Sequence, residues 1–334
     1  MIRTEIHIPI SPTPDFLIRV HYLAASIEMY SGLSPGSYKI VVTVGDATRV
    51  DIEDLCPWAI RYPIEWRWVP DQEWLERGIF ATAFGRFRYA FEADAVVMLD
   101  GDVLVTGSLA EMVNEAVGTL RFHAIPAPYS PFFCYQGCLE QRSPHEWWAE
   151  IFRLAGLSPP ILSMEHLAWP WMQEQDWPYL EQLQFGPPYP NAGVIIGSAE
   201  TMRRIGASIY EDLDTVNTVF CNVLSGQVAL SLAISRQGLE WAPLPLRYNV
   251  PNVQQFHDTY PDEAADVRVL HFLQTTEIDR VADFQSYAHL EQALNRSGLS
   301  PLNAFLAERL RSVHLAKVSS DLHVLSAREF NDRS

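Results

Sequence analysis

The first hundred residues alternate between two hydrophobic periods. Apolar side chains recur at helical spacing between Phe16 and Ile27, and a further helix is predicted over residues 80–92. Short apolar runs typical of β-strands lie at residues 4–10, 38–46, 62–70 and from Ala95 onward. The run at 38–46 is almost wholly apolar, like strands that are buried on both faces of a parallel sheet. This alternation predicts an α/β fold with a Rossmann-like nucleotide-binding sheet.

The pattern changes after residue 125. The segment 126–190 holds eleven of the 23 prolines and five of the ten tryptophans, which excludes long regular elements and predicts short helices joined by irregular loops. Sheet-like runs and helices, including one near residues 199–213, follow it. We therefore expect one domain over residues 1–285 that contains this segment as an insertion, and a helical C-terminal extension over 286–334.

Charge and hydropathy exclude some classes of function. The 334 residues include 24 basic and 41 acidic side chains, a net charge of −17, and such a protein should repel a nucleic-acid backbone. The sequence shows no apolar run long enough for a signal peptide or a membrane span, so we expect a cytoplasmic protein. Residues 296–334 have only a small basic excess, too small to predict membrane contact.

Asp100-Gly101-Asp102 interrupts a continuous apolar stretch with two carboxylates. Two buried like charges without a partner would cost several kcal/mol, so the pair must face solvent or bind a cation. At the end of a buried strand, the carboxylates would open into the crevice where α/β sheets bind their ligands. Hard oxygen ligands of this kind suit Mg²⁺ or Mn²⁺ together with the phosphates of a nucleotide. The alternative is a plain Asp-Gly turn between two strands.

This string resembles the aspartate-any-aspartate segment of GT-A glycosyltransferases, and its context resembles the retaining family eight that includes glycogenin and the lipopolysaccharide galactosyltransferases. The resemblance covers roughly residues 4 to 275. Four further segments match in order: the stretch FGRFRYAFEAD with Arg86 or Arg88, Pro190-Asn191-Ala192-Gly193-Val194, Ser225-Gly226-Gln227-Val228-Ala229-Leu230, and Leu270-His271-Phe272.

The resemblance implies a GT-A fold with residues 126–190 as an inserted acceptor subdomain. It also implies a metal-dependent transfer of a sugar from a nucleotide-sugar, with a UDP-sugar favoured, to a carbohydrate or glycoconjugate acceptor. Asp100, Asp102 and His271 would hold Mn²⁺ or Mg²⁺, and Gln227 and Asn191 would line the sugar pocket as the catalytic candidates. The nucleotide site would comprise Ile10, Arg86, Asp100, Gly101 and Asp102.

The chain also departs from the family pattern. Gly226 stands where an aspartate is expected before Gln227, Ser231 replaces an asparagine, and the Lys-Pro-Trp expected after His271 is missing. Retention of configuration is the favoured outcome, but an inverting reaction would need a carboxylate base such as Glu174 or Asp176. A nucleotidyl or sugar-nucleotide transferase and a catalytically inactive binding protein stay open as alternatives.

The aromatic residues of the insertion have flat apolar faces with polar edges, and such faces suit sugar rings and apolar aglycones. Filling the core of a loop-rich segment is an equally good explanation for any one of them. The candidates for the acceptor site are Trp147, Trp148, Trp169, Trp171, Trp177, Tyr129, Tyr135, Tyr179 and Tyr189. The acidic net charge leads to a further expectation: a nucleotide diphosphate binds only with a metal ion that offsets both sets of negative charge.

Overall fold

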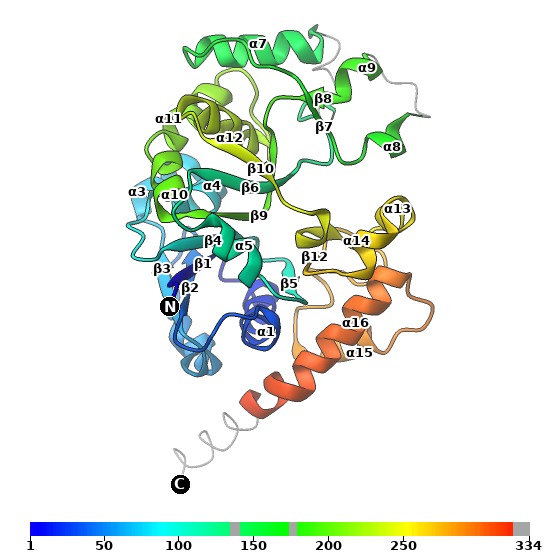
Figure 1. Ribbon diagram of the computed structural model, residues 1–334. Coiled ribbons are helices and arrows are strands. Elements are labelled where there is room, and N and C mark those ends of the chain that lie inside the picture. Colours follow the sequence, from blue (N-terminus) through cyan, green and yellow to red (C-terminus); the bar gives the residue numbers. More distant parts are fainter. Residues whose placement is uncertain (134–140, 174–178, 323–334) are drawn as a thin grey trace.

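A mixed seven-stranded sheet forms the centre of the molecule (Figure 1). The computed structural model describes residues 1–133, 141–173 and 179–322. Within these residues β9 is antiparallel to its neighbours β4 and β6, and every other pairing in the sheet is parallel. The strands lie in the order β10 (Glu240–Pro243), β6 (Arg121–Pro126), β9 (Pro190–Ser198), β4 (Ala95–Leu99), β1 (Thr4–Ile10), β2 (Tyr38–Val44) and β3 (Ile64–Trp68). The expected α/β fold is confirmed.

Two hydrophobic cores cover the two faces of this sheet. Successive side chains of a strand point to opposite faces, and in β4 Val97 and Leu99 join one core while Val96 and Met98 join the other. The described helices are α1 (Pro14–Tyr30), α2 (Ile52–Leu55), η1 (Pro57–Arg61), α3 (Asp71–Arg77), α4 (Ile79–Phe84), η2 (Gly85–Arg88), α5 (Ala110–Ala116), α7 (Pro144–Leu154), α8 (Trp169–Met172), α9 (Leu180–Leu183), α10 (Ala199–Gly206), α11 (Ile209–Asn217), α12 (Ser225–Arg236), η3 (Leu246–Tyr248), α13 (Gln254–Thr259), α14 (Pro261–Ala265), α15 (Tyr287–Leu294), α16 (Pro301–Val313) and η4 (His314–Val318).

A second, three-stranded sheet begins directly after β4. The turn Asp100–Asp102 leads from β4 into β5 (Val103–Val105), which pairs in antiparallel fashion with β12 (Val269–His271). β12 also pairs in parallel with β11 (Val250–Pro251). Residues 164 to 168 positions apart along the chain therefore meet at the end of the central sheet.

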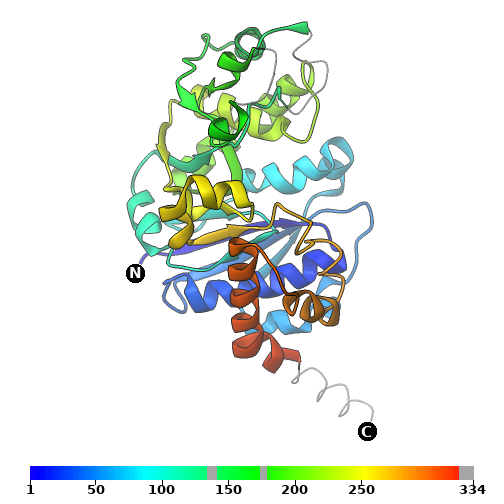
Figure 2. The same ribbon diagram turned by 90° about the vertical axis from the view of Figure 1, so that its right-hand side faces the viewer.

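The Pro- and Trp-rich segment lies above the central sheet, at the top of Figures 1 and 2. It contains α7, α8 and α9 and a two-stranded sheet of β7 (Met164–Glu165) and β8 (Phe185–Gly186). Trp147 and Trp148 of α7 are 6% and 0% exposed and belong to the core, so these two residues do not form a sugar-binding surface. The candidates Tyr135 and Trp177 lie outside the described residues.

Two predicted helices are shorter in the structure. The helix expected over residues 80–92 ends at Arg88, because α4 gives way at Gly85 to the 3₁₀ turn η2. The helix expected near 199–213 is divided into α10 and α11 after Gly206. A Cβ atom at Gly206 would lie 2.0 Å from the carbonyl oxygen of Phe87, so this glycine allows η2 and α10 to touch.

The C-terminal helices pack against α1. His21 of α1 hydrogen-bonds through Nε2 to Asp321 at 3.0 Å, and Tyr22 contacts Nδ1 of His314 at 2.7 Å. Leu306 and Leu310 of α16 belong to the same core as α1. Across the part of the chain that the structure describes, no helix combines the length and the apolar character that crossing a membrane requires.

Candidate active site

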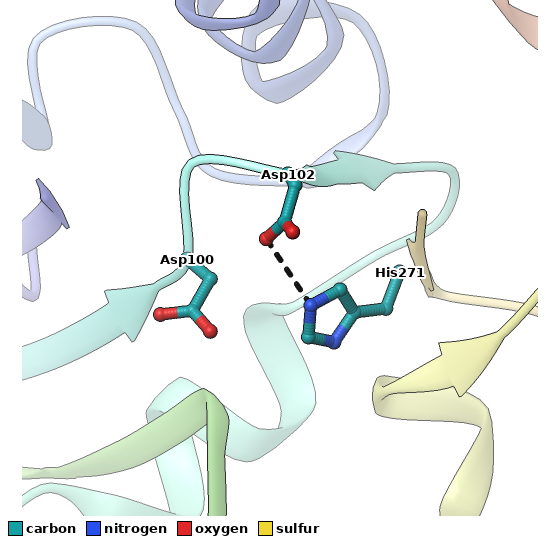
Figure 3. A group of neighbouring side chains, drawn as sticks. All are labelled: Asp100, Asp102 and His271. Carbon is teal, nitrogen blue, oxygen red and sulfur yellow. Dashed lines mark hydrogen bonds and ion pairs between the residues drawn. The ribbon is translucent and has the colours of Figure 1, made fainter. Parts of the chain in front are cut away.

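Strand pairing brings Asp100, Asp102 and His271 together. Asp100 follows β4 and Asp102 precedes β5, while the β5–β12 register places His271 opposite Val103. One ligand atom from each of the three side chains lies within 4.8 Å of the others. Figure 3 shows both carboxylates and the imidazole around one common space, with Nε2 of His271 3.1 Å from Oδ1 of Asp102.

The negative charge of the two carboxylates in this cluster is only partly neutralised by the neighbouring cationic groups. Burial, with Asp102 beside it, raises the pKa of Asp100 to about 6. Burial would also raise the pKa of Asp102, but the neighbouring His271 and Arg280 bring it below its usual value. Burial would lower the pKa of His271, and the Asp102 carboxylate outweighs that effect and raises it. The site therefore favours an added positive charge.

A chain of amides orients the imidazole. Nδ1 of His271 lies 3.0 Å from Oδ1 of Asn249, whose Nδ2 donates to Oδ1 of Asn191 at 2.9 Å. The same Asn191 oxygen accepts the backbone N–H of Gly193 at 2.8 Å. Since Asn249 Oδ1 can only accept, His271 donates its Nδ1 proton to it. Nε2 faces Asp102: it donates to that carboxylate while it carries a proton, and it offers its lone pair to a metal ion once that proton is lost.

The residues fit a divalent cation. Two carboxylates and an imidazole nitrogen are donors that Mn²⁺ and Mg²⁺ accept in proteins. The hydrogen bond from Nδ1 to Asn249 is the outer contact that metal-binding histidines typically make. Both features are present in the protein itself, so the predicted ligands Asp100, Asp102 and His271 are brought together in an arrangement suited to metal.

Arg280 contacts the same cluster. Its Nη1 donates to Oδ2 of Asp102, and its side chain is 35% exposed. The sequence offered no local signal for this residue, because it lies in the irregular segment after His271. Asn249 also has no local signal in the sequence, because it reaches the site only through the pairing of β11 with β12.

Arg86, predicted to belong to the nucleotide site, does not face the cleft. Its hydrogen bonds join α4, β1 and β4. It is 1% exposed and donates hydrogen bonds of 2.8 Å to the carbonyl oxygens of Ala83, His7 and Leu99. Its Nη2 lies 3.9 Å from Oδ1 of Asp100. The alternative, Arg88, pairs with Glu73 at the surface at 3.0 Å.

A cleft of about 350 Å³ opens beside the carboxylates. Its described lining combines the metal cluster with residues from the sheet edge, α4, α12 and the insertion: Ala83, Phe84, Asp100, Asp102, Ala127, Pro128, Tyr129, Tyr189, Asn191, Ala192, Gly193, Val223, Leu224, Gln227, His271, Leu273 and Arg280. Both catalytic candidates, Asn191 and Gln227, therefore line it, and Oε1 of Gln227 accepts the N–H of Ala192 at 3.1 Å.

Other predicted residues lie behind the cleft. Ile10 is 2% exposed in the core under the sheet edge, and Gly101 packs against Phe16, whose ring a Cβ atom would approach to 2.9 Å. Gly226, which replaces an expected aspartate, lies under Phe84: a Cβ there would be 2.0 Å from Cε2 of that ring. The possible bases Glu174 and Asp176 lie outside the described residues.

Comparison with known proteins gives a fold and no sequence family. No family model matches the chain, and no curated protein matches it by sequence. Among solved structures, the galactosyltransferase LgtC, in a complex with donor and acceptor sugar analogues, is 16% identical with a TM-score of 0.51, covering 89% of this chain and 98% of LgtC.

Two further structures are similar. Mouse xyloside xylosyltransferase 1 is 11% identical with a TM-score of 0.50, covering 83% of this chain and 99% of that one. The bifunctional glycosyltransferase WbbM is 15% identical with a TM-score of 0.50; the match covers 92% of this chain, which spans about half the length of WbbM. The Asp100–Asp102–His271 cluster at the end of the central sheet thus belongs to a chain with the GT-A fold of these glycosyltransferases.

Proposed function

We propose that this protein is a metal-dependent glycosyltransferase that moves a sugar from a nucleotide-sugar to a carbohydrate or glycoconjugate acceptor. The single observation that carries the proposal is the Asp100–Asp102–His271 cluster, with its imidazole already oriented by Asn249. The GT-A fold supports it, because the similar structures are described as galactosyl-, xylosyl- and other glycosyltransferases.

In this reaction the departing nucleoside diphosphate gains negative charge. A divalent ion held by Asp100, Asp102 and His271 would offset that charge, the chemistry that metals supply to phosphate leaving groups. The chain's own residues orient the ligands and shape the cleft: Asn249 holds His271 by a hydrogen bond, and Tyr129 and Tyr189 line the cleft. A UDP-sugar donor is the favoured choice.

Gln227 is proposed to contact the sugar beside its anomeric carbon. Its carboxamide lines the cleft and is held by the N–H of Ala192. One similar structure, 15% identical with a TM-score of 0.53, is described as an active-site mutant of LgtC in which a glutamate replaces a glutamine. We propose a retaining reaction, in which no separate carboxylate base is needed at this position. Asn191 acts as a positioning residue, since its oxygen binds both Gly193 N and Asn249 Nδ2.

The acceptor is proposed to carry an apolar group. A second pocket of about 250 Å³ adjoins the cleft and shares Tyr129, Asn191 and His271 with it. Its remaining lining is mostly apolar and includes Leu167 and Trp171, and the Trp171 indole N–H donates to Oγ1 of Thr259 at 2.7 Å, which fixes the ring. Alkyl or aryl glycosides should therefore be better acceptors than the corresponding free sugars, and Trp171→Ala should remove that preference; equal rates on both kinds of acceptor would contradict it.

The function is tested by calorimetry with a panel of nucleoside diphosphates, with Mn²⁺ and with chelator. We expect the nucleoside diphosphate with one particular base to bind in the presence of Mn²⁺, and to bind at least about tenfold more weakly in chelator. Asp102→Asn should abolish donor hydrolysis and transfer with the melting temperature nearly unchanged, and the matched control Asp258→Asn, at a carboxylate that is 62% exposed, should change neither.

The alternatives predict different results. Full turnover of Asp102→Asn, or of the wild type in metal-free buffer, would overturn the proposal. Metal-dependent nucleotide binding without hydrolysis or transfer of any donor would favour the inactive binding protein, whereas pyrophosphate release from a nucleoside triphosphate would indicate a nucleotidyl transferase.

A further inference from the structure

Both oxygens of Asp102 are already occupied within the protein. Oδ1 lies 3.1 Å from Nε2 of His271, and Oδ2 accepts from Nη1 of Arg280. The Asp102 side chain is 14% exposed and that of Arg280 is 35% exposed, so solvent screens these contacts only in part. A divalent ion that binds Asp102 would therefore meet a guanidinium cation on the same carboxylate, and the two cations would repel each other.

The backbone beneath Arg280 is held by its neighbours, whereas the side chain is 35% exposed. Ile278 and Phe284 on either side are 0% exposed. Asp279 accepts the N–H groups of Val281 and Ala282 at 2.7 and 2.9 Å, which closes the turn. A partly exposed guanidinium on such a fixed turn can change partners without moving the main chain.

Within the described lining of the cleft, Arg280 is the one arginine or lysine. The other two arginines near the aspartates are held elsewhere. Arg86 is bound to three carbonyl oxygens, and Arg19 pairs with Asp15 at 2.5 Å and is 3% exposed. An anion that enters the cleft therefore finds one cation able to reach it, and a guanidinium is well suited to phosphate oxygens.

We propose that Arg280 is a mobile counter-ion that exchanges Asp102 for the diphosphate of the bound nucleotide. Before binding, it neutralises Asp102 and weakens metal binding there. When metal and nucleotide enter together, the ion replaces it on Asp102, and the guanidinium pairs with phosphate oxygens in the cleft. The inference rests on the proposed function, because the diphosphate is the ligand that the function requires.

This exchange couples the two ligands. Arg280 opposes the metal alone and favours the metal together with a diphosphate, so each ligand strengthens the binding of the other. An ordinary phosphate-binding arginine would have only the second effect. The affinity for metal in the absence of nucleotide therefore distinguishes the exchange from simple phosphate binding.

The test compares the full-length wild type with Arg280→Met and Arg280→Lys. Mn²⁺ binding without nucleotide is followed by the electron paramagnetic resonance signal of the free ion, and UDP binding at saturating Mn²⁺ by calorimetry. We expect Arg280→Met to bind Mn²⁺ about tenfold or more tightly, because no guanidinium then competes for Asp102, and to bind UDP about tenfold or more weakly, because a charged hydrogen-bond donor to the phosphates is lost. Arg280→Lys should lie between these values, and Arg153→Met, at a 65% exposed arginine that pairs with Glu150, should change neither affinity.

Three outcomes would overturn the exchange: unchanged or weaker Mn²⁺ binding by Arg280→Met, no Mn²⁺ binding by either protein, or UDP affinity unaffected by the substitution. Failure of the proposed function looks different. In that case no nucleoside diphosphate of the panel binds to the wild type in Mn²⁺, and tighter Mn²⁺ binding by Arg280→Met would then support only the competition at Asp102.

Discussion

Two arginines flank the aspartate pair, and they differ in their exposure and in the kind of group they bind. Arg86 is 1% exposed and donates to three backbone carbonyl oxygens, one each in α4, β1 and β4. Arg280 is 35% exposed, and its guanidinium meets the carboxylate of Asp102. A buried guanidinium with several fixed acceptors ties elements together, whereas a part-exposed one with a single charged partner is free to exchange it. Arg86 therefore belongs to the part of the site that holds the fold together, here called the scaffold side. Arg280 belongs to the part that faces the cleft, here called the ligand side.

The largest expected effect is on the scaffold side. Arg86→Met should lower the free energy of unfolding by about 3–5 kcal/mol, because it removes three hydrogen bonds to backbone carbonyl oxygens and a cation near Asp100. Urea unfolding monitored by fluorescence measures this loss of unfolding free energy. The neighbour Arg88, 42% exposed and paired with Glu73, is the matched control, and Arg88→Met should cost less than about 1 kcal/mol. Equal losses for the two variants would remove the distinction.

Two buried histidines show a similar contrast: carboxylates act on the pKa of one, and no charged group among the described residues acts on the pKa of the other. His271 and His166 are 5% and 2% exposed. Carboxylates raise the pKa of His271 against the effect of burial, while burial lowers the pKa of His166 from 6.5 to about 4.

A pH titration of stability tests His166. Between pH 6.5 and 4 the unfolded chain takes up a proton that folded His166 does not, so acidification should reduce stability by at most about 3 kcal/mol, with no contribution above pH 6.5. His166→Asn should flatten this part of the profile of unfolding free energy against pH, and His145→Asn, at an exposed position on α7, should not. A profile of His166→Asn that matches the wild type would contradict the assignment.

The amide chain behind the ligand side should have an intermediate effect. Asn249→Ala frees the imidazole of His271 to rotate and should weaken Mn²⁺ binding by about 10–100-fold, the usual consequence of losing an outer contact of a metal ligand. Asn295→Ala, at an exposed asparagine after α15, is the control. Undiminished Mn²⁺ binding by Asn249→Ala would mean that the β5–β12 pairing alone orients His271.

The smallest effect is expected for the stability of Arg280→Met. A part-exposed ion pair contributes little to folding, so the free energy of unfolding should change by less than about 1 kcal/mol even though ligand binding changes strongly. Urea unfolding without ligands checks this. A loss as large as that of Arg86→Met would place Arg280 on the scaffold side and would remove the contrast between the two arginines.

The sheet and the metal cluster were predictable because their signals are local or periodic. The strands 4–10 and 38–44 are apolar runs buried on both faces, and Asp100 and Asp102 interrupt such a run. The α/β class follows from these patterns, and resemblance to GT-A glycosyltransferases supplied His271.

What could not be predicted depends on contacts between distant segments. Arg86 shows no sign in the sequence of turning inward, since its direction follows from the 3₁₀ turn that begins at Gly85. Asn249 and Arg280 reach the site only because β11 and β12 pair and the chain then returns past Asp102. The division of the helix at Gly206 likewise reflects its close contact with Phe87.

Gly226 has a consequence for how this chain can diverge. The ring of Phe84 occupies the space that any side chain at position 226 would need. An aspartate at 226 therefore requires the Phe84 ring to move aside or to be replaced by a smaller side chain. The two positions form an epistatic pair, so in descendants of this chain a carboxylate at 226 should occur together with a small residue at 84.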